Sequence, residues 1–237
     1  MKNILLLLVS IFGFLTCTAQ KHSIEVVYKV AIREDGIYND YIEKNPESYD
    51  LFDGIETFAD WFDLQLWIGD EFSFYQTLEV AEPPNAPRSF QSFLSDISYD
   101  SNYFFNLKDK KIYQQTFHKN KEILIEANQD NYQWEITDET KDIQGFTCYK
   151  ALLKFKDRKP TFIAWFAPEL PYPTGPLEFV GLPGLILELR TPFYVYGAKS
   201  INFKLPYKNI QLPNLPIRTY EEVESEARAW IQQNLSK

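Results

Sequence analysis

Few residues in this chain are of types that could act in catalysis or bind a metal. The sequence contains two histidines, His22 and His118, which excludes an HExxH metalloprotease motif and a three-histidine zinc site. Cys148 could form a nucleophilic pair with either histidine, and the charge of nearby Lys150 would lower the pKa of its thiol. The alternative is that Cys148 packs as a small apolar residue on a strand. The 33 acidic residues allow too many pairings to single out a carboxylate pair for glycoside hydrolysis.

A run of aromatic residues could instead contact an apolar ligand. In a predicted strand, Phe162, Ala164 and Phe166 share one face, while Ile163 and Trp165 share the other. A strand that is apolar on both faces either lies under a helix or lines a cavity, and core aromatics are the commoner case. In the second case, Phe162, Trp165 and Phe166 would bind an acyl chain, a hydrophobic peptide or a partner's strand.

Residues 1–19 have the features of a secretory signal peptide. Lys2 supplies the positive charge, residues 4–15 form the apolar region, and Cys17-Thr18-Ala19 is a small-residue cleavage site. The apolar region is shorter than the roughly 20 residues that span a bilayer. We therefore expect residues 20–237 to form a single exported domain without a transmembrane segment, in the periplasm, on the cell surface or outside the cell.

Cleavage after Ala19 would place His22 third in the exported chain. A free terminal amine, two amide nitrogens and the His22 imidazole form a square-planar set that suits Cu(II) or Ni(II). Gln20 weakens this candidate, because an N-terminal glutamine tends to cyclise and block the amine. We expect no other metal site and no cofactor.

The composition of the chain indicates which kinds of partner it can bind and what stabilises its fold. The formal net charge of −9 argues against a nucleic-acid partner, because phosphate binding needs a basic surface. Cys148 is the one cysteine outside the signal region, so the fold must be stabilised by its hydrophobic core rather than by disulfides.

The chain from Ile24 onward has the alternating pattern of half-buried antiparallel strands. Ile24, Val26 and Tyr28 alternate with residues of the opposite face, and Trp134 and Ile136 do the same. Further strands are expected, from turn clusters and apolar runs, at 103–107, 112–117, 122–127, 132–137, 146–155, 161–167, 185–190 and 194–204. This pattern predicts a mainly β (α+β) fold with a curved antiparallel meander sheet, for which a half-barrel is one form.

Helical patterns are fewer. Thr219 and Glu222 form a capping box. An apolar stripe follows, made of Tyr220, Val223, Ala227, Trp230, Ile231 and Leu235. The predicted C-terminal helix should pack on the sheet rather than protrude. We also expect a helical insertion at 45–60, a proline-rich loop at 82–88 and a short helix at 89–96.

The hexapeptide Gly181-Leu182-Pro183-Gly184-Leu185-Ile186 has a conformational signature. Pro183 fixes φ and Gly184 tolerates a positive φ, which predicts a type II turn over Leu182–Leu185. Gly181 would allow close backbone approach, and Leu185 and Ile186 would anchor the next strand. None of these side chains can act as an acid, base or nucleophile, which favours a structural role.

The hexapeptide is the signature of the GLPGLI family of secreted bacterial proteins, which the chain resembles over residues 141–190. The resemblance also includes Ile143, Gly145, Cys148, Lys150, Ala151, Ala164, Trp165, Phe166, Gly175, Pro176 and Phe179. The family has no established biochemical function. Its members tend to be encoded near TonB-dependent outer-membrane receptors, which implies an exported partner of uptake machinery.

These observations predict a non-enzymatic envelope protein that binds a hydrophobic or peptide ligand or serves as an accessory to an outer-membrane receptor. An uncharacterised hydrolase or peptidase is one alternative, and it requires Cys148 or a carboxylate pair in contact with His118. A purely structural envelope protein is the other, and it requires a fully packed concave face.

Overall fold

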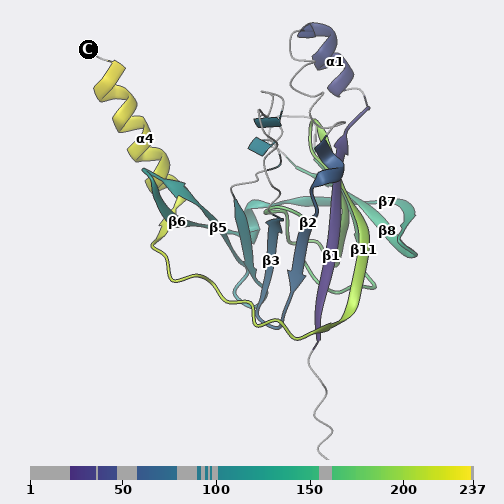
Figure 1. The fold of residues 1–237 in the computed structure, drawn as a ribbon. Coiled ribbons are helices and arrows are strands. Elements are labelled where there is room, and N and C mark those ends of the chain that lie inside the picture. Colours follow the sequence, from purple (N-terminus) through teal and green to yellow (C-terminus); the bar gives the residue numbers. More distant parts are fainter. Residues whose placement is uncertain are drawn as a thin grey trace, which may run out of the picture.

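The computed structural model describes residues 22–35, 37–46, 58–78, 90–91, 94–95, 97, 101–154 and 162–235. The predicted mainly β class is confirmed, because one twelve-stranded sheet dominates the structure (Figure 1). Its strands are β1 (His22–Ile32), β2 (Leu64–Ile68), β3 (Phe72–Thr77), β4 (Asn102–Asn106), β5 (Lys111–His118), β6 (Lys121–Asn128), β7 (Trp134–Ile143), β8 (Phe146–Leu153), β9 (Ile163–Ala167), β10 (Leu185–Arg190), β11 (Tyr194–Pro206) and β12 (Ile217–Thr219). The helices are α1 (Ile37–Lys44), η2 (Ala59–Trp61), η3 (Gln129–Asn131) and α4 (Tyr220–Leu235).

The sheet consists of two meanders that meet at β1 and β11. Its strand order is β12-β6-β5-β4-β3-β2-β1-β11-β10-β9-β8-β7, and the sheet is not closed. Each neighbouring pair is antiparallel except β12 and β6, which are parallel. β2 and β3 are absent from the sequence-based prediction, although Leu64, Leu66 and Ile68 alternate with less buried residues.

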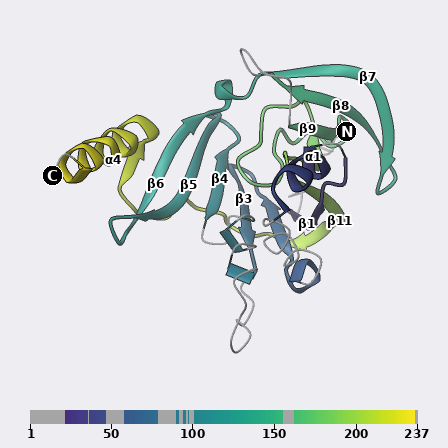
Figure 2. The ribbon, with the colours of Figure 1, turned by 90° about the horizontal axis from the view of Figure 1, so that it is seen from above.

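The link between β6 and β7 forces the sheet to curve. Nine strands separate β6 from β7 in the sheet, so a flat sheet would place them about 48 Å apart. Only five residues separate them in sequence, and the six steps from Asn128 to Trp134 reach at most about 22 Å. The sheet therefore bends around a concave face, as Figure 2 shows from above.

The concave face is filled by residues 168–184, which connect β9 to β10 and are called the inner segment here. Thr174 Oγ1 and Ser73 Oγ of β3 are 2.8 Å apart, and the indole Nε1 of Trp134 donates to the carbonyl of Val180 at 2.9 Å. Just after the segment, at the start of β10, the carbonyl of Ile186 accepts a hydrogen bond from the hydroxyl of Tyr28 at 2.6 Å. The inner segment is thus bonded to strands of both meanders.

Two glycines of the hexapeptide have roles opposite to those predicted. The positive φ of 95° belongs to Gly181, whereas a Cβ at Gly184 would overlap the carbonyl oxygen of Ala167 and lie 2.7 Å from its carbonyl carbon. The amide of Leu185 donates to the carbonyl of Leu170 at 2.9 Å. The predicted type II turn at Leu182–Leu185 is therefore wrong, because packing against the end of β9 sets the conformation there.

The opposite face of β2–β6 is covered by residues 207–216, which run from β11 to β12. Ile210, Leu212 and Leu215 pack in one cluster with Phe104 and Leu124. The ammonium of Lys208 lies 4.1 Å from the ring centre of Trp67. This strap leads the chain to the far edge of the sheet, where β12 pairs with β6.

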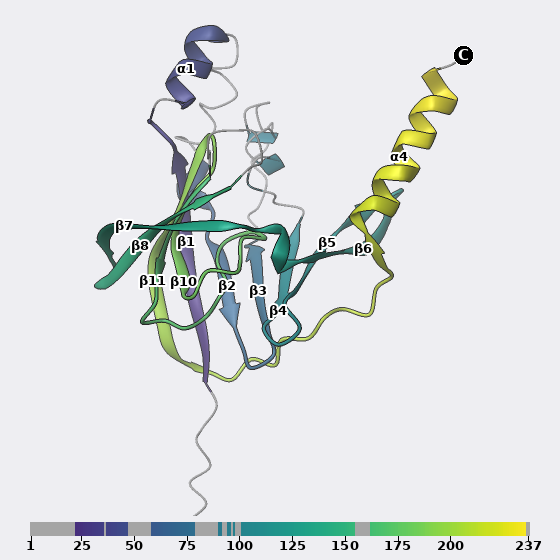
Figure 3. The ribbon, with the colours of Figure 1, turned by 180° about the vertical axis from the view of Figure 1, so that it is seen from behind.

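Helix α4 begins with the predicted capping box. The amide of Glu222 donates to Thr219 Oγ1 at 3.3 Å, and the amide of Thr219 donates to Glu222 Oε2 at 3.0 Å. The helix packs on the edge of the sheet, against β12 and β6. Beyond that contact it extends away (Figures 1 and 3), so the expectation that it would not protrude is corrected. The reason is that β12 ends at the sheet edge and continues directly into the helix.

The remaining predicted helices are only partly described. Of the predicted helical insertion at 45–60, residues 47–57 lie outside the described part. Helix α1 ends at Lys44, just before the insertion, and η2 begins at Ala59, near its end. The proline-rich loop at 82–88 also lies outside it. Of the predicted helix at 89–96, the described residues 90–91 and 94–95 are helical.

We predict that Gly184→Ala destabilises the protein by about 3 kcal/mol, because the added methyl group cannot fit against the backbone of Ala167. Gly197→Ala is the matched control, since nothing lies within 4 Å of a Cβ there, and it should change stability by less than about 0.5 kcal/mol. Urea unfolding followed by tryptophan fluorescence measures both. Equal stability of the two variants would contradict the close approach at Gly184.

Candidate functional site

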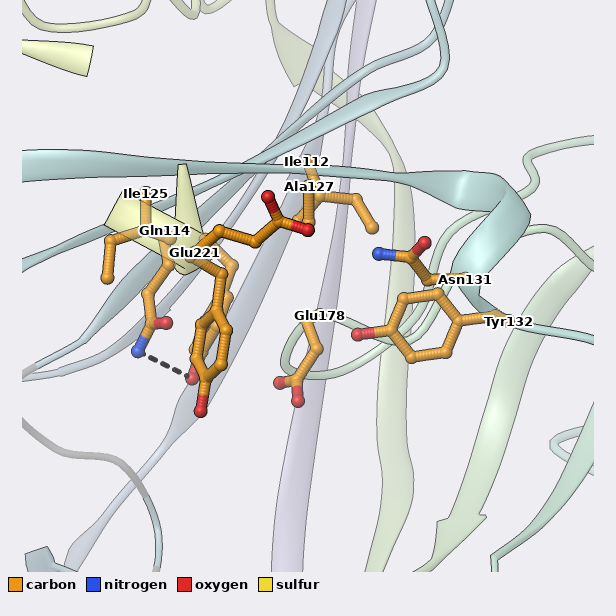
Figure 4. A pocket seen from close by; sticks show the side chains of 10 residues that line it. Ile112, Gln114, Ile125, Ala127, Asn131, Tyr132, Glu178 and Glu221 are labelled. Atoms are coloured by element: carbon orange, nitrogen blue, oxygen red, sulfur yellow. Dashed lines mark hydrogen bonds between the residues drawn. The ribbon is translucent and has the colours of Figure 1, made fainter. Parts of the chain in front are cut away.

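A cavity of about 480 Å³ opens on the concave face. Its walls come from β4, β5 and β6, from the connection after β6, from the inner segment and from the start of α4 (Figure 4). The lining residues are Tyr103, Ile112, Gln114, Ile125, Ala127, Asn131, Tyr132, Glu178, Tyr220 and Glu221.

The register of β4, β5 and β6 determines which side chains form the floor of this cavity. Tyr103, Gln114 and Ile125 are direct partners across β4, β5 and β6, so their side chains share one face. Ile112 and Ala127 are paired on the same face of β5 and β6. Gln114 Nε2 donates to the hydroxyl of Tyr103 at 3.3 Å, which fixes the amide at the cavity wall. The floor thus combines apolar side chains with an oriented amide.

Glu178 supplies a carboxyl group to the cavity from the inner segment. In Figure 4 it lies between Gln114 and Tyr132, with the hydroxyl of Tyr132 directed toward it. Burial raises the pKa of Glu178, and no salt bridge to it is present in the described ranges. The pKa of Tyr132 is raised as well, first by burial and then by the charge of Glu178. A half-buried acid with a raised pKa in a cavity is a mark of a functional site.

The backbone next to Glu178 is strained. Leu177 has a φ of 57°, a conformation that a bulky side chain rarely adopts. Contacts on both sides hold it, since the amide of Phe179 donates to the carbonyl of Pro176 at 3.4 Å and the amide of Ile186 donates to that of Thr174 at 3.0 Å. Strain of this kind persists only where the surroundings enforce it, and it is common at binding sites.

A small void adjoins the main cavity. Its volume is about 10 Å³, and its walls include Tyr75 along with Tyr103 and Glu178 of the main cavity. The hydroxyl of Tyr75 is buried there without a hydrogen-bond partner in the described structure. The concave face is therefore open to solvent at the main cavity and tightly packed behind it.

The aromatic residues predicted to bind a ligand lie elsewhere. Phe162 packs on Phe179 of the inner segment, with ring centres 5.3 Å apart, and Phe166 is fully buried. Trp165 points to the other face, where the ammonium of Lys141 lies 4.4 Å from its ring centre. The structure does not bring the three together, and none of them lines the 480 Å³ cavity. Ligand contact by these residues stays a prediction.

Cys148 is fully buried on β8, as expected if it packs as a small apolar residue. The β7–β8 hairpin bends toward β11, where Gln144 Nε2 donates to the carbonyl of Ala198 at 3.1 Å and Phe146 contacts Phe203. Burial raises the pKa of the Cys148 thiol to about 11, although Lys141 acts in the opposite direction. The expectation of a lowered pKa is therefore wrong in sign, because desolvation outweighs the lysine.

His118 lies in a second cavity, of about 400 Å³, beside β12 and α4. Its Nε2 is 3.1 Å from Glu226 Oε2, which also accepts from Lys119 Nζ at 2.6 Å. Arg218 donates to the other carboxylate oxygen of Glu226 at 2.7 Å. These three donors lower the pKa of Glu226 to about 2, so this cluster fastens α4 to the β5–β6 hairpin.

The metal hypothesis at His22 rests on residues beyond the described part, because Gln20 and Lys21 lie outside it. His22 itself starts β1, with its Nδ1 3.4 Å from the carbonyl oxygen of Leu205. Within the described ranges, no three His, Cys, Asp or Glu side chains gather as a metal site would require. No helix in those ranges has the length and apolar character needed to cross a membrane.

Sequence reasoning missed the residues that line the main cavity. Glu178 carried a usable signal, since it is a lone acid within the apolar run Pro176-Leu177-Glu178-Phe179-Val180. Tyr103, Gln114 and Tyr132 carried none, because polar and aromatic residues at strand positions are common.

Comparison with known proteins gives a local family match and a shared fold. Residues 153–188 match the model of a family described as "Protein of unknown function (Porph_ging)". This stretch runs from the end of β8 into β10 and includes the inner segment and the hexapeptide. A search of curated proteins found no significant match.

Two crystal structures of PNGF-II, in space groups C2 and P21, are similar to this chain. Each superposes with a TM-score of 0.54 and 14% sequence identity, and covers 86% of this chain. At this identity, the likeness shows the fold alone. The chain spans 32% of the length of PNGF-II in these structures.

We predict that Glu226 contributes a pH-dependent stabilisation. Its pKa is about 2 in the folded protein, against about 4.3 for an unfolded glutamate. A lowered pKa stabilises the fold fully above the unfolded value, and this contribution is lost as pH falls from about 4.5 toward 2. The urea midpoint of Glu226→Gln should therefore fall less between pH 6 and pH 3 than that of the native chain.

Glu224→Gln is the control, because among the described residues Glu224 pairs only within α4, with Arg228 at 2.6 Å. It should keep the pH dependence of the native chain. The same pH dependence in both variants would show that Glu226 does not fasten the helix.

Proposed function

We propose that this chain is an exported cell-envelope protein of the GLPGLI family that binds a hydrophobic or peptide ligand in the 480 Å³ cavity. The match at residues 153–188 supports the family, and the predicted signal peptide at 1–19 supports export to the periplasm, cell surface or medium. An outer-membrane TonB-dependent receptor is the partner implied by the resemblance. The recurrence of the fold as 32% of the longer PNGF-II chain supports its use as an accessory module.

The observation that carries this proposal is the cavity itself. Its volume lies within the range of about 300–1,000 Å³ that is usual for small-molecule sites. Its lining is mainly apolar and aromatic, with a few convergent polar groups on Gln114, Asn131 and Glu178. Such a lining offers apolar contact area for affinity and polar groups for orientation.

The two alternatives meet different obstacles. A purely structural protein was expected to have a fully packed concave face, and the open cavity counts against it. A hydrolase or peptidase was expected to bring Cys148 or a carboxylate pair to His118. Among the described contacts, His118 meets Glu226 alone of the acids, and Glu226 is held by three basic side chains.

Native mass spectrometry of the full chain purified from its own envelope tests the proposal. We expect a small molecule that is lost on denaturation. Ala127→Trp fills the cavity from β6 and should abolish this added mass, whereas Lys199→Trp, at an exposed position of β11, should keep it. A bare native chain, or equal ligand retention by both variants, would contradict binding in this cavity.

A further inference from the structure

The charged groups that line the cavity are all acidic. Glu178 and Glu221 contribute carboxyl groups, and no Lys, Arg or His is among the lining residues that the structure describes. Three tyrosines, Tyr103, Tyr132 and Tyr220, complete the polar lining along with two amides. The described lining therefore presents anionic groups and aromatic rings to an occupant, and it contains no cation to receive an anion.

Glu178 has no cationic partner in the described structure, in contrast to Glu126 and Glu226. Glu126 of β6 is paired with Lys111 at 2.8 Å, and Glu226 has three basic partners. A buried carboxylate without a cation is costly, and proteins usually pair or protonate such a group. The strained backbone at Leu177 nevertheless holds Glu178 toward the open cavity.

We propose that the cavity binds an organic cation, a primary ammonium or guanidinium group attached to an apolar body, whose charge pairs with Glu178. This inference rests on the proposed function and names the class of its ligand. A free amine or the lysine or arginine side chain of a peptide can supply the cation. The tyrosine rings favour a cation as well, because their faces attract positive charge.

The same lining disfavours an acyl chain with a free carboxylate. A ligand carboxylate in this cavity would meet two acidic side chains and no base. Within the apolar and peptide ligands expected from the sequence, the structure thus selects those that carry positive charge.

Binding of a cation at Glu178 has a pH dependence of defined sign. The ionisable groups that face Glu178 are Tyr75, Tyr103, Tyr132 and Glu221, none of which is basic. A raised pKa means that part of the free protein carries a protonated Glu178, which must lose its proton to pair with a cation. Affinity for a cation should therefore rise with pH through the titration of Glu178. A ligand that accepts a hydrogen bond from the protonated acid would show the opposite trend.

Isothermal titration calorimetry of the full chain with three probes of equal length tests this inference. The probes are n-hexylammonium, n-hexanol and n-hexanoate. We expect hexylammonium to bind at least about tenfold more tightly than the other two at pH 8, and less tightly at pH 5. A tenfold difference corresponds to about 1.4 kcal/mol. N-acetyl-lysine methylamide, added as a fourth probe, shows whether a peptide side chain also enters, and binding by either cation supports the inference.

Glu178→Gln keeps the shape of the side chain and removes its charge, and it should lower hexylammonium affinity at least tenfold and abolish the pH dependence. Glu43→Gln is the matched control for net charge, because Glu43 is exposed on α1, away from the cavity lining, and it should bind like the native chain. The pH profile of the native chain provides a test that needs no variant.

Two results would overturn the inference of cation binding at Glu178 and would leave the proposed function unaffected. One is tighter binding of hexanol or hexanoate, and the other is hexylammonium binding that survives Glu178→Gln. Absence of binding by both cations at millimolar concentration would also overturn it. The proposed function would then be decided separately, by ligand retention in the Ala127→Trp and Lys199→Trp variants.

Discussion

The short link between β6 and β7 is the constraint on which the rest of the structure depends. Two strands with nine others between them in the sheet are joined through only five residues, so the sheet has to curve until β6 and β7 approach each other. Curvature creates a concave face whose apolar side chains need a cover. The inner segment, residues 168–184, provides it from within the sheet, between β9 and β10. Hydrogen bonds to β3 and β7 join this segment to both meanders.

The hexapeptide serves this packing and, through it, the cavity. Gly184 allows the segment to pass against the end of β9, and Gly181 supplies the positive φ at which the chain turns beside Gln129. With both ends of the segment fixed, its middle carries a strained Leu177 and the half-buried Glu178. The hexapeptide has no chemically active side chain of its own, but its packing can position the carboxyl group of Glu178. This connects the family resemblance to a site that the motif itself does not contain.

The parts of the fold that could be predicted from the sequence are those set by local patterns. Local patterns predicted β1 and the strands from β4 to β11, although β7 continues to Ile143, six residues past its predicted end. The Thr219–Glu222 box predicted the start of α4. The errors arose where distant contacts decide the outcome. The pKa of the Cys148 thiol is raised by burial rather than lowered by a lysine, and the conformation of Gly184 is set by Ala167, which no local pattern reveals. The cavity was not predicted for the same reason, since register and curvature bring its lining together from six parts of the chain.

Amide hydrogen exchange of the inner segment tests the central claim most directly. An irregular connection of this length would ordinarily exchange within seconds, because its amides would be open to solvent. Here the amides of Leu170, Thr174 and Gly181 donate to the carbonyls of Ala167, Tyr172 and Pro173. We expect these amides to exchange as slowly as those of the central strands β1 and β11, through global unfolding only. Rapid exchange of the segment beside protected strands would show that it does not fill the concave face.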